Sequence, residues 1–360
     1  MRVFHVISGF ENGGVETLIW RWVTHMPKDI EFHIVAHEIL VPACVERFRE
    51  HGVAVHLVPS RKHVLRHRRA LISLFRTYRP EVVHVHTTER GAFALSAAKK
   101  AGVGCRIQHS HAARWEKNPV LRFVHALSYA WARHTATDYF ACGTAAALAA
   151  FGKRGVTRAR IIRNGIDVQA FAYREALRRR TREALGIAED QTVIGMIARF
   201  SPQKNHVGAL TIFKAFYEKH QNAVLLLVGD GHLRASTEEL ARRILPEEAV
   251  RFLGVRTDVP ALYAAMDRFI LPSRFEGLPI TLIEAQACGL PAVVSDAVTR
   301  EGDICGITEF INTARIYEWV SALSAPEKAE RSSYAARVSA AGYSLQEIAG
   351  ELYRFYKSKA

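Results

Sequence analysis

Cysteine is scarce in this chain, and the spacing of its cysteines excludes two classes of small stapled protein. The 360 residues contain five cysteines, an odd number with no C-x-x-C pair. A disulfide framework needs paired cysteines, and a zinc ribbon needs closely spaced ones. We therefore expect buried free thiols at Cys44, Cys105, Cys142, Cys288 and Cys305.

Long apolar runs are missing as well. The richest run, 223–229, has only the length of a strand, whereas a helix that spans a bilayer needs about 20 apolar residues. Residues 1–10 lack the apolar core and the small-residue cleavage site of a signal peptide. We therefore expect a cytoplasmic protein without a membrane span. A chain of 360 residues that is 49% apolar is long enough for two domains.

Acidic residues are unevenly distributed. Residues 1–165 hold 25 Lys and Arg against 11 Asp and Glu, together with 14 of the 17 histidines, and the remainder carries no net charge. We expect the first half to become more positive as its imidazoles titrate in mild acid. Residues 51–80 contain no Asp or Glu. Two interpretations of this stretch stay open: solvated arginines on a packed helix, or a basic surface for anionic lipid or an anionic acceptor. The apolar stripe of this helix is expected at Val64, Leu65, Leu71, Ile72, Phe75 and Tyr78.

Short Val- and Ile-rich runs alternate with helix-period segments along the whole chain. Strands without a polar face, each followed by a helix, predict parallel sheets covered on both sides. We therefore expect an α/β protein with two Rossmann-like domains, 1–168 with a terminal helix at 344–360, and 169–343. The Arg-rich stretch 167–187 has the composition of a connector. The expected strands are 3–7, 32–36, 53–58, 82–85, 106–109, 139–142, 161–163, 193–198, 224–228, 251–253, 269–271 and 292–295.

Two loops in this pattern have residues suited to phosphate binding. Gly13 and Gly14 lie between the first strand and the first helix, where backbone N–H groups can approach an anion, although a tight turn alone also explains them. Arg199 and Lys204 follow the first strand of the second domain, at the edge where open α/β sheets bind ligands. Such cations can hold a diphosphate without metal. Two unrelated surface cations are the alternative.

A third segment has two carboxylates. Glu276 precedes a helix that starts near Pro279 and ends before Gly289. Glu284 lies inside this otherwise apolar helix, where a carboxylate is costly without a partner such as the vicinal hydroxyls of a ribose or hexose. A solvent-facing Glu284 is the alternative.

These motifs together resemble family 4 glycosyltransferases of GT-B fold. The E-x7-E pair, the R-x4-K pair and the early Gly-Gly turn occur in the expected order over nearly the whole chain. Segments 106–111 and 284–287 resemble the branch found in bacterial exopolysaccharide and capsule loci. The resemblance implies retaining transfer of a hexosyl unit from a nucleotide sugar, with UDP expected, in a cleft between two domains. It also implies a terminal helix that crosses back to the first domain.

The resemblance also implies roles in donor binding. Arg199 and Lys204 would neutralise the departing diphosphate, and Glu284 would hold the ribose. Gly13 and Gly14 would approach the diphosphate.

Other residues would lie nearer the reacting sugar. The resemblance implies that Glu276 and the backbone of Gly277 and Leu278 contact the donor sugar and phosphates. The family also has a histidine at the end of a first-domain strand, for which both His109 and His111 qualify because alternation places them on one side. We favour His111.

The sequence also bears on metals and cofactors, and we expect neither. His84 and His86 form an H-x-H pair that metals use, but no third ligand is evident. No two Asp residues have the D-x-D spacing of the metal-dependent transferases of the other common fold. No carboxylate in the first domain is evident as a nucleophile, so we expect front-face attack guided by the leaving phosphate.

The expected partners follow from the same resemblance. They are a nucleotide sugar, a glycan or polyprenyl-linked saccharide acceptor, and anionic lipid of the inner leaflet, with no nucleic acid. Two other functions stay open: a nucleotide-sugar 2-epimerase of the same fold, and a basic nucleic-acid-binding protein. The second lacks a binding motif in which aromatic residues alternate with Gly and Lys.

Overall fold

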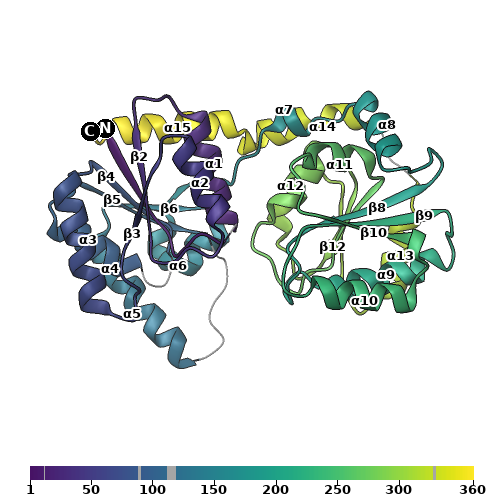
Figure 1. Cartoon of the computed structure of the whole chain (residues 1–360), viewed down its shortest axis with the longest axis horizontal. Coiled ribbons are helices and arrows are strands. Elements are labelled where there is room, and N and C mark those ends of the chain that lie inside the picture. The colour runs from purple at the N-terminus through teal and green to yellow at the C-terminus, as the bar shows by residue number, and fades with distance from the viewer. Residues whose placement is uncertain (12, 88–90, 112–118, 327–329) are drawn as a thin grey trace. The chain divides into compact units, whose positions relative to one another are not determined.

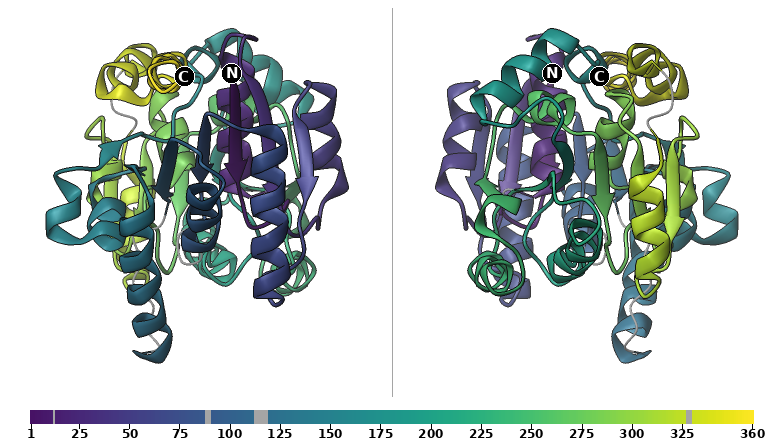
Figure 2. Two further views of the ribbon diagram at one scale, coloured as in Figure 1. Left: turned by 90° about the vertical axis from the view of Figure 1, so that its left-hand side faces the viewer. Right: turned by 90° about the vertical axis from the view of Figure 1, so that its right-hand side faces the viewer.

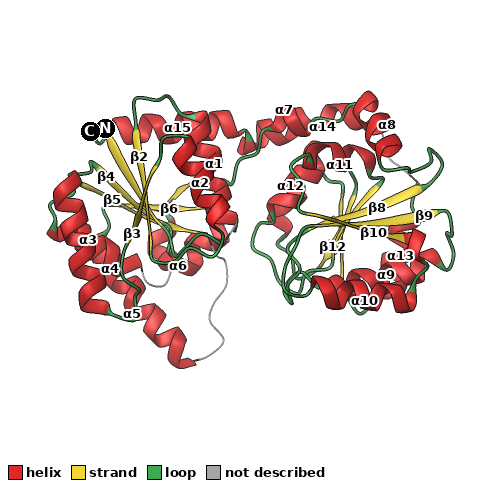
Figure 3. Cartoon of the chain, viewed as in Figure 1, coloured by secondary structure: helices red, strands yellow, loops and turns green. Residues whose placement is uncertain are grey.

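The computed structural model describes residues 1–11, 13–87, 91–111, 119–326 and 330–360, with backbone alone for 119–126. The chain divides into two compact units, Met1–Gly165 with Leu345–Ala360, and Ile166–Ser344. Each unit has a parallel sheet with helices on both of its faces (Figures 1 and 3). The predicted fold class, two Rossmann-like α/β domains, is therefore confirmed. Within the described residues, no helix combines the length and apolar character needed to cross a bilayer.

The first unit contains a seven-stranded sheet in the order β3-β2-β1-β4-β5-β6-β7. The strand order reverses beside β1, whose neighbours β2 and β4 are not consecutive in the chain. The strands are β1 (Arg2–Val6), β2 (Glu31–Ala36), β3 (Ala54–Leu57), β4 (Val82–Val85), β5 (Cys105–Ser110), β6 (Asp138–Ala141) and β7 (Arg160–Ile161). The helices are α1 (Gly14–His25), α2 (Pro42–Glu50), α3 (Val64–Tyr78), α4 (Gly91–Lys100), α5 (Pro119–Thr135), α6 (Thr144–Val156) and α15 (Leu345–Lys357).

The last helix, α15, belongs to the first unit, as predicted. Its apolar face, which includes Ile348, Leu352 and Tyr356, is buried in one core with Ile19 and Trp22 of α1. The N- and C-termini consequently lie close together (Figure 2).

The basic helix α3 is only partly as predicted. Leu71 and Phe75 are buried, but Val64 and Leu65 at its start are 44% and 70% exposed. The apolar stripe is therefore shorter than expected, and two apolar side chains lie beside the exposed Arg66.

The second unit contains a six-stranded parallel sheet in the order β10-β9-β8-β11-β12-β13. The strands are β8 (Thr192–Ile197), β9 (Ala223–Val228), β10 (Val250–Gly254), β11 (Arg268–Leu271), β12 (Ala292–Ser295) and β13 (Thr308–Ile311). The α-helices are α7 (Val168–Phe171), α8 (Glu175–Ala184), α9 (His206–Tyr217), α10 (Arg234–Ile244), α11 (Val259–Ala265), α12 (Ile280–Ala287), α13 (Ile316–Ser324) and α14 (Tyr334–Val338). Strand β13 was not predicted, because this edge strand is only partly buried and lacks a continuous apolar run.

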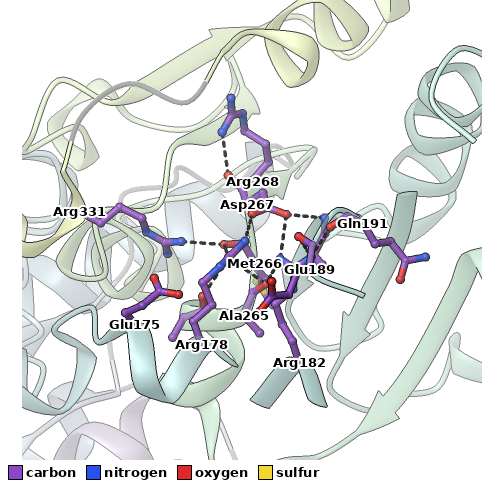
Figure 4. Close-up of polar contacts among 12 residues, drawn as sticks. Glu175, Arg178, Arg182, Glu189, Gln191, Ala265, Met266, Asp267, Arg268 and Arg331 are labelled. Atoms are coloured by element: carbon purple, nitrogen blue, oxygen red, sulfur yellow. Dashed lines mark hydrogen bonds and ion pairs between the residues drawn. The ribbon is translucent and has the colours of Figure 1, made fainter. Parts of the chain in front are cut away.

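The stretch predicted as a connector instead contains the helices α7 and α8, which are part of the second unit. Asp267 accepts from Arg178 at 2.5 Å, from Arg182 at 3.3 Å and from the Val193 N–H at 2.7 Å (Figure 4). Arg182 is only 3% exposed. Composition suggested a connector, but Arg178 and Arg182 hold α8 against the start of β11. Removing one partner of such a buried pair is strongly destabilising, because the other charge is left unpaired.

Candidate functional site

In the second unit, the predicted site residues meet where the strand order reverses. Neighbouring strands β8 and β11 are not consecutive in the chain, and open α/β sheets bind ligands outside the carboxyl ends of such strands. The loop after β8 contains Lys204, and the loop after β11 contains Glu276. The Lys204 Nζ lies 2.5 Å from the Glu276 Oε1. The structure thus brings together the R-x4-K and E-x7-E motifs.

Hydrogen bonds fix these two loops to one another. The Arg274 N–H donates to the Gln203 carbonyl at 2.8 Å, and the Gln203 Nε2 donates to the Phe275 carbonyl at 3.1 Å. Asn205 has a left-handed φ of 57°. Its Oδ1 accepts from the Gly208 N–H at the start of α9, and its Nδ2 donates to the Pro272 carbonyl at 3.0 Å. Sequence reasoning missed this role of Asn205, although an Asn before a helix is a recognised cap.

A third loop, after β9, packs closely against the first. Gly229 and Gly231 have φ values of 131° and 155°, and a Cβ on either would collide with the carbonyl oxygen of Ala198 or Phe200. Only glycine allows both this backbone conformation and this approach. The loop that contains Arg199 therefore contacts both the loop after β9 and the loop after β11.

Three other predicted donor residues lie on or just before α12. Glu284 is only 4% exposed, and the Tyr263 hydroxyl donates to its Oε2 at 3.2 Å. The solvent-facing alternative for Glu284 is therefore wrong. Gly277 and Leu278 are half-buried in the loop before this helix. Arg199, in the loop after β8, is exposed.

In the first unit, Gly13 and Gly14 begin helix α1, while Asn12 of the same motif lies outside the described residues. Gly13 has φ −93° and no side-chain cap. A Cβ on Gly14 would meet no atom within 4 Å of the described structure. Neither a positive φ nor packing therefore requires glycine at position 14. This weakens the tight-turn interpretation and leaves open space at a helix N-terminus, where anions bind favourably.

We therefore expect Gly14→Ala to raise the stability of the fold and to lower the affinity for nucleotide. Because alanine is the better helix former, stability should rise by up to about 1 kcal/mol. If the backbone here approaches a phosphate, nucleotide affinity should fall about ten-fold, a change of about 1.4 kcal/mol. Thermal melting and calorimetric titration with UDP measure the two effects.

Gly104→Ala is the matched control, because a Cβ there also meets nothing within 4 Å. Its UDP affinity should equal that of the native chain. Unchanged affinity in Gly14→Ala would remove Gly14 from the site.

The most unusual feature of the first unit is a cluster of five histidines on one face of the sheet. His5 lies on β1, where it pairs in register with His84 of β4. His86 follows β4, His109 lies on β5 and His111 follows β5. Strand alternation directs all five side chains to the same face. We call these five residues the histidine cluster. Trp22 of α1 covers it, with its ring 6.0 Å from that of His84 and 5.8 Å from that of His109.

Hydrogen bonds join the cluster into two rows. In one, the His84 Nδ1 lies 2.7 Å from the Tyr356 hydroxyl and its Nε2 lies 3.0 Å from the His109 Nδ1. In the other, the His86 Nε2 lies 2.9 Å from the His5 Nδ1 and its Nδ1 lies 2.8 Å from the His111 Nε2. Because a neutral imidazole has one donor and one acceptor, the tautomers within each row are coupled.

Burial keeps the cluster uncharged at neutral pH. It lowers the pKa of His5 to about 3 and that of His111 to about 4. Burial, reinforced by neighbouring imidazoles, also lowers the pKa values of the other three well below 6.5. The expected rise in positive charge in mild acid is therefore wrong for these five histidines.

The structure also distinguishes the two histidines predicted near the donor. His109 is fully buried, whereas His111 is half-buried, so only His111 can touch a ligand directly here. The third ligand that was not evident in the sequence is present in the structure, because His5 joins His84 and His86. The histidine spacing along three strands was visible in the sequence, but the register that aligns the strands was not.

Comparisons with known proteins agree with this architecture. Residues 12–170 match the family model "Glycosyltransferase Family 4", and residues 178–307 match "Glycosyl transferases group 1". EpsF of Bacillus subtilis (strain 168), which its name assigns provisionally to the glycosyltransferases, is 31% identical over 99% of this chain and 96% of its own length. The UDP-Gal:alpha-D-GlcNAc-diphosphoundecaprenol alpha-1,3-galactosyltransferase of Escherichia coli is 29% identical over 63% of this chain and 62% of its own length.

Solved structures show the same fold. Anabaena Alr3699/HepE in complex with UDP-glucose superimposes with a TM-score of 0.81 at 18% identity, over 99% of this chain and 100% of the other. WaaG, a glycosyltransferase involved in lipopolysaccharide biosynthesis, has a TM-score of 0.73 at 18% identity, over 98% and 99%. The full-length sequence match, the two family models and the paired sheets together identify this chain as a member of the family 4 glycosyltransferases of GT-B fold.

Proposed function

We propose that this enzyme transfers a hexosyl unit, with retention, from a UDP-sugar to a polyprenyl-linked saccharide during exopolysaccharide or capsule synthesis. The name of the Escherichia coli relative includes both a UDP-sugar donor and a diphosphoundecaprenol acceptor. A second relative is the Vi polysaccharide biosynthesis protein VipC/TviE of Salmonella typhi, 37% identical over 33% of this chain. These names support the donor, acceptor and pathway class.

The contact between Lys204 and Glu276 at the strand reversal carries the proposal. Cleavage of the bond to the anomeric carbon places negative charge on the leaving diphosphate. Fixed cations at that position stabilise the transition state without having to reorganise. Lys204, held by Glu276 at 2.5 Å, and the exposed Arg199 supply such charges. This makes a metal ion unnecessary for leaving-group stabilisation.

The remaining residues then have consistent roles. Glu284 binds the ribose hydroxyls, and the backbone at Gly277 and Leu278 contacts the phosphates. His111, uncharged at neutral pH, donates or accepts a hydrogen bond at the donor sugar. The acceptor hydroxyl attacks the anomeric carbon of the donor sugar on the same face that the diphosphate leaves. The departing diphosphate takes the proton of this hydroxyl.

Calorimetric titration with UDP, GDP and ADP in the presence of EDTA tests this function. The native chain should bind UDP, and Glu284→Ala should weaken that binding about 100-fold, because the ribose loses a charge-assisted bidentate contact. Glu309→Ala, an exposed glutamate of the edge strand β13, is the control and should bind normally. Failure of the native chain to bind any of the three nucleotides would refute the proposal, and preference for GDP or ADP would refute the UDP donor.

The acceptor part of the proposal predicts contact with a membrane surface. Helix α3 presents exposed arginines, including Arg66 and Arg69, next to the exposed Leu65. Anionic lipid attracts such a surface by about 1 kcal/mol for each basic residue. In flotation at low salt, the chain should therefore rise with vesicles that contain phosphatidylglycerol and not with vesicles of phosphatidylcholine alone.

Arg66→Glu with Arg69→Glu should abolish this flotation. Arg242→Glu, on an exposed position of α10 in the second unit, should not. Equal flotation of the α3 variant and the native chain would show that α3 is not the membrane surface.

A further inference from the structure

We propose that the histidine cluster contains a binding site for a divalent transition-metal ion of the zinc class, formed by His86, His109 and His111. Ligand nitrogens of these three side chains all lie within 4.8 Å of one another. Three imidazoles with an open fourth position are a common zinc environment. The proposed metal is not part of the transfer reaction, for which we propose no metal.

Little movement is needed to form the site. Bonds of 2.0 to 2.1 Å to a tetrahedral ion place ligand nitrogens about 3.4 Å apart. The His86 Nδ1 and the His111 Nε2 are now 2.8 Å apart, closer than that. The widest separation in the trio, at most 4.8 Å, would close by about 1.4 Å shared between two side chains.

A second group, His5, His84 and His86, satisfies the same distance criterion. All three of its side chains are fully or almost fully buried, at 4% exposure or less. The proposed trio instead includes the half-buried His111. The exposed part of His111 gives the ion an entry path, which a metal site requires.

An unsatisfied atom at the cluster supports the proposal. Among the described residues, the Nε2 of the fully buried His109 has no hydrogen-bond partner, and such atoms are rare because they are costly. A metal ion bound to the His109 Nε2 would give this nitrogen the partner that it lacks. The neighbouring imidazoles are already arranged as the outer partners that orient metal-bound histidines. The His84 Nε2 lies 3.0 Å from the His109 Nδ1, and the His5 Nδ1 lies 2.9 Å from the His86 Nε2.

The site shares His111 with the proposed transfer reaction. A metal on this imidazole and a sugar contact to it exclude one another, so bound zinc would inhibit transfer. This consequence rests on the proposed function. Metal binding itself does not, because it is measured without donor or acceptor.

The test is equilibrium dialysis of the full chain, without an affinity tag, against ZnCl2 after treatment with EDTA. One tightly bound equivalent is expected. Each of His86→Gln, His109→Gln and His111→Gln should weaken binding at least about ten-fold. Co2+ added to the native chain should give the visible absorption of a tetrahedral nitrogen site.

His56→Gln is the matched control. The His56 Nε2 lies 2.9 Å from the His33 Nδ1 in the same sheet, so this variant disrupts a similar imidazole pair outside the trio. It should bind zinc as the native chain does. If His109→Gln does not fold, the half-buried His111→Gln still tests the site. Absence of tight zinc binding, or binding of one equivalent that survives in all folded variants, would overturn the proposal.

Discussion

Lys204→Ala is expected to lower the rate constant of sugar transfer by about 10²- to 10³-fold, the loss typical when one fixed group that stabilises transition-state charge is removed. The ammonium lies at the strand reversal, 2.5 Å from Glu276. The diphosphate of the bound donor is already negative, but a further negative charge develops on it as it leaves. The effect should therefore fall mainly on kcat, with a smaller change in KM. Steady-state kinetics with a UDP-sugar measures both constants.

The variant also leaves the Glu276 carboxylate without its cation, and that carboxylate could itself repel the diphosphate. Lys204→Ala combined with Glu276→Gln separates these causes, because the double variant has no unpaired charge. If Lys204 acts on the leaving group, the double variant stays as slow as the single one. Lys214→Ala is the control: this half-buried lysine of α9 pairs with Glu218, and its loss should leave kcat unchanged. Full recovery in the double variant would show that Lys204 serves only to neutralise Glu276.

The first unit of the metal-free protein is expected to unfold in mild acid. The five cluster imidazoles have folded-state pKa values far below the unfolded value of 6.5, with His5 at about 3 and His111 at about 4. The unfolded chain therefore binds more protons at any pH between these values, and stability falls as the pH falls below 6.5. At pH 5 the protonation of His5 and that of His111 in the unfolded chain each cost the folded state about 2 kcal/mol, and a domain has only about 5–15 kcal/mol in total.

Thermal melting between pH 7.5 and pH 4.5 in EDTA measures this loss. The melting temperature should be constant above pH 7 and fall steeply below pH 6. His5→Phe removes one titrating group from a position surrounded by aromatic rings, so its curve should be less steep. His220→Phe changes an exposed histidine of the second unit and should keep the native slope. A melting temperature independent of pH over this range would show that the cluster is not neutral and buried in solution.

The strand and helix pattern was largely readable from the sequence. Strands buried on both faces of a parallel sheet need nearly continuous apolar runs, which is why β4 and β12 were predicted with their observed bounds. The edge strand β13 is only partly buried and has no continuous apolar run, so it was not predicted. Helix α8 was missed for another reason: its Arg-rich composition is that of a connector, and only the structure places Asp267 beside Arg178 and Arg182.

The sequence by itself determined the fold class, the terminal helix, and the two motifs of the second unit, because these depend on local order along the chain. Only the tertiary structure decided that Lys204 meets Glu276, that Glu284 is buried, and that His111 rather than His109 is accessible. The histidine cluster also belongs to tertiary structure. Its members come from β1, β4 and β5 and their ends, and strand order and register, which no local pattern encodes, bring them together.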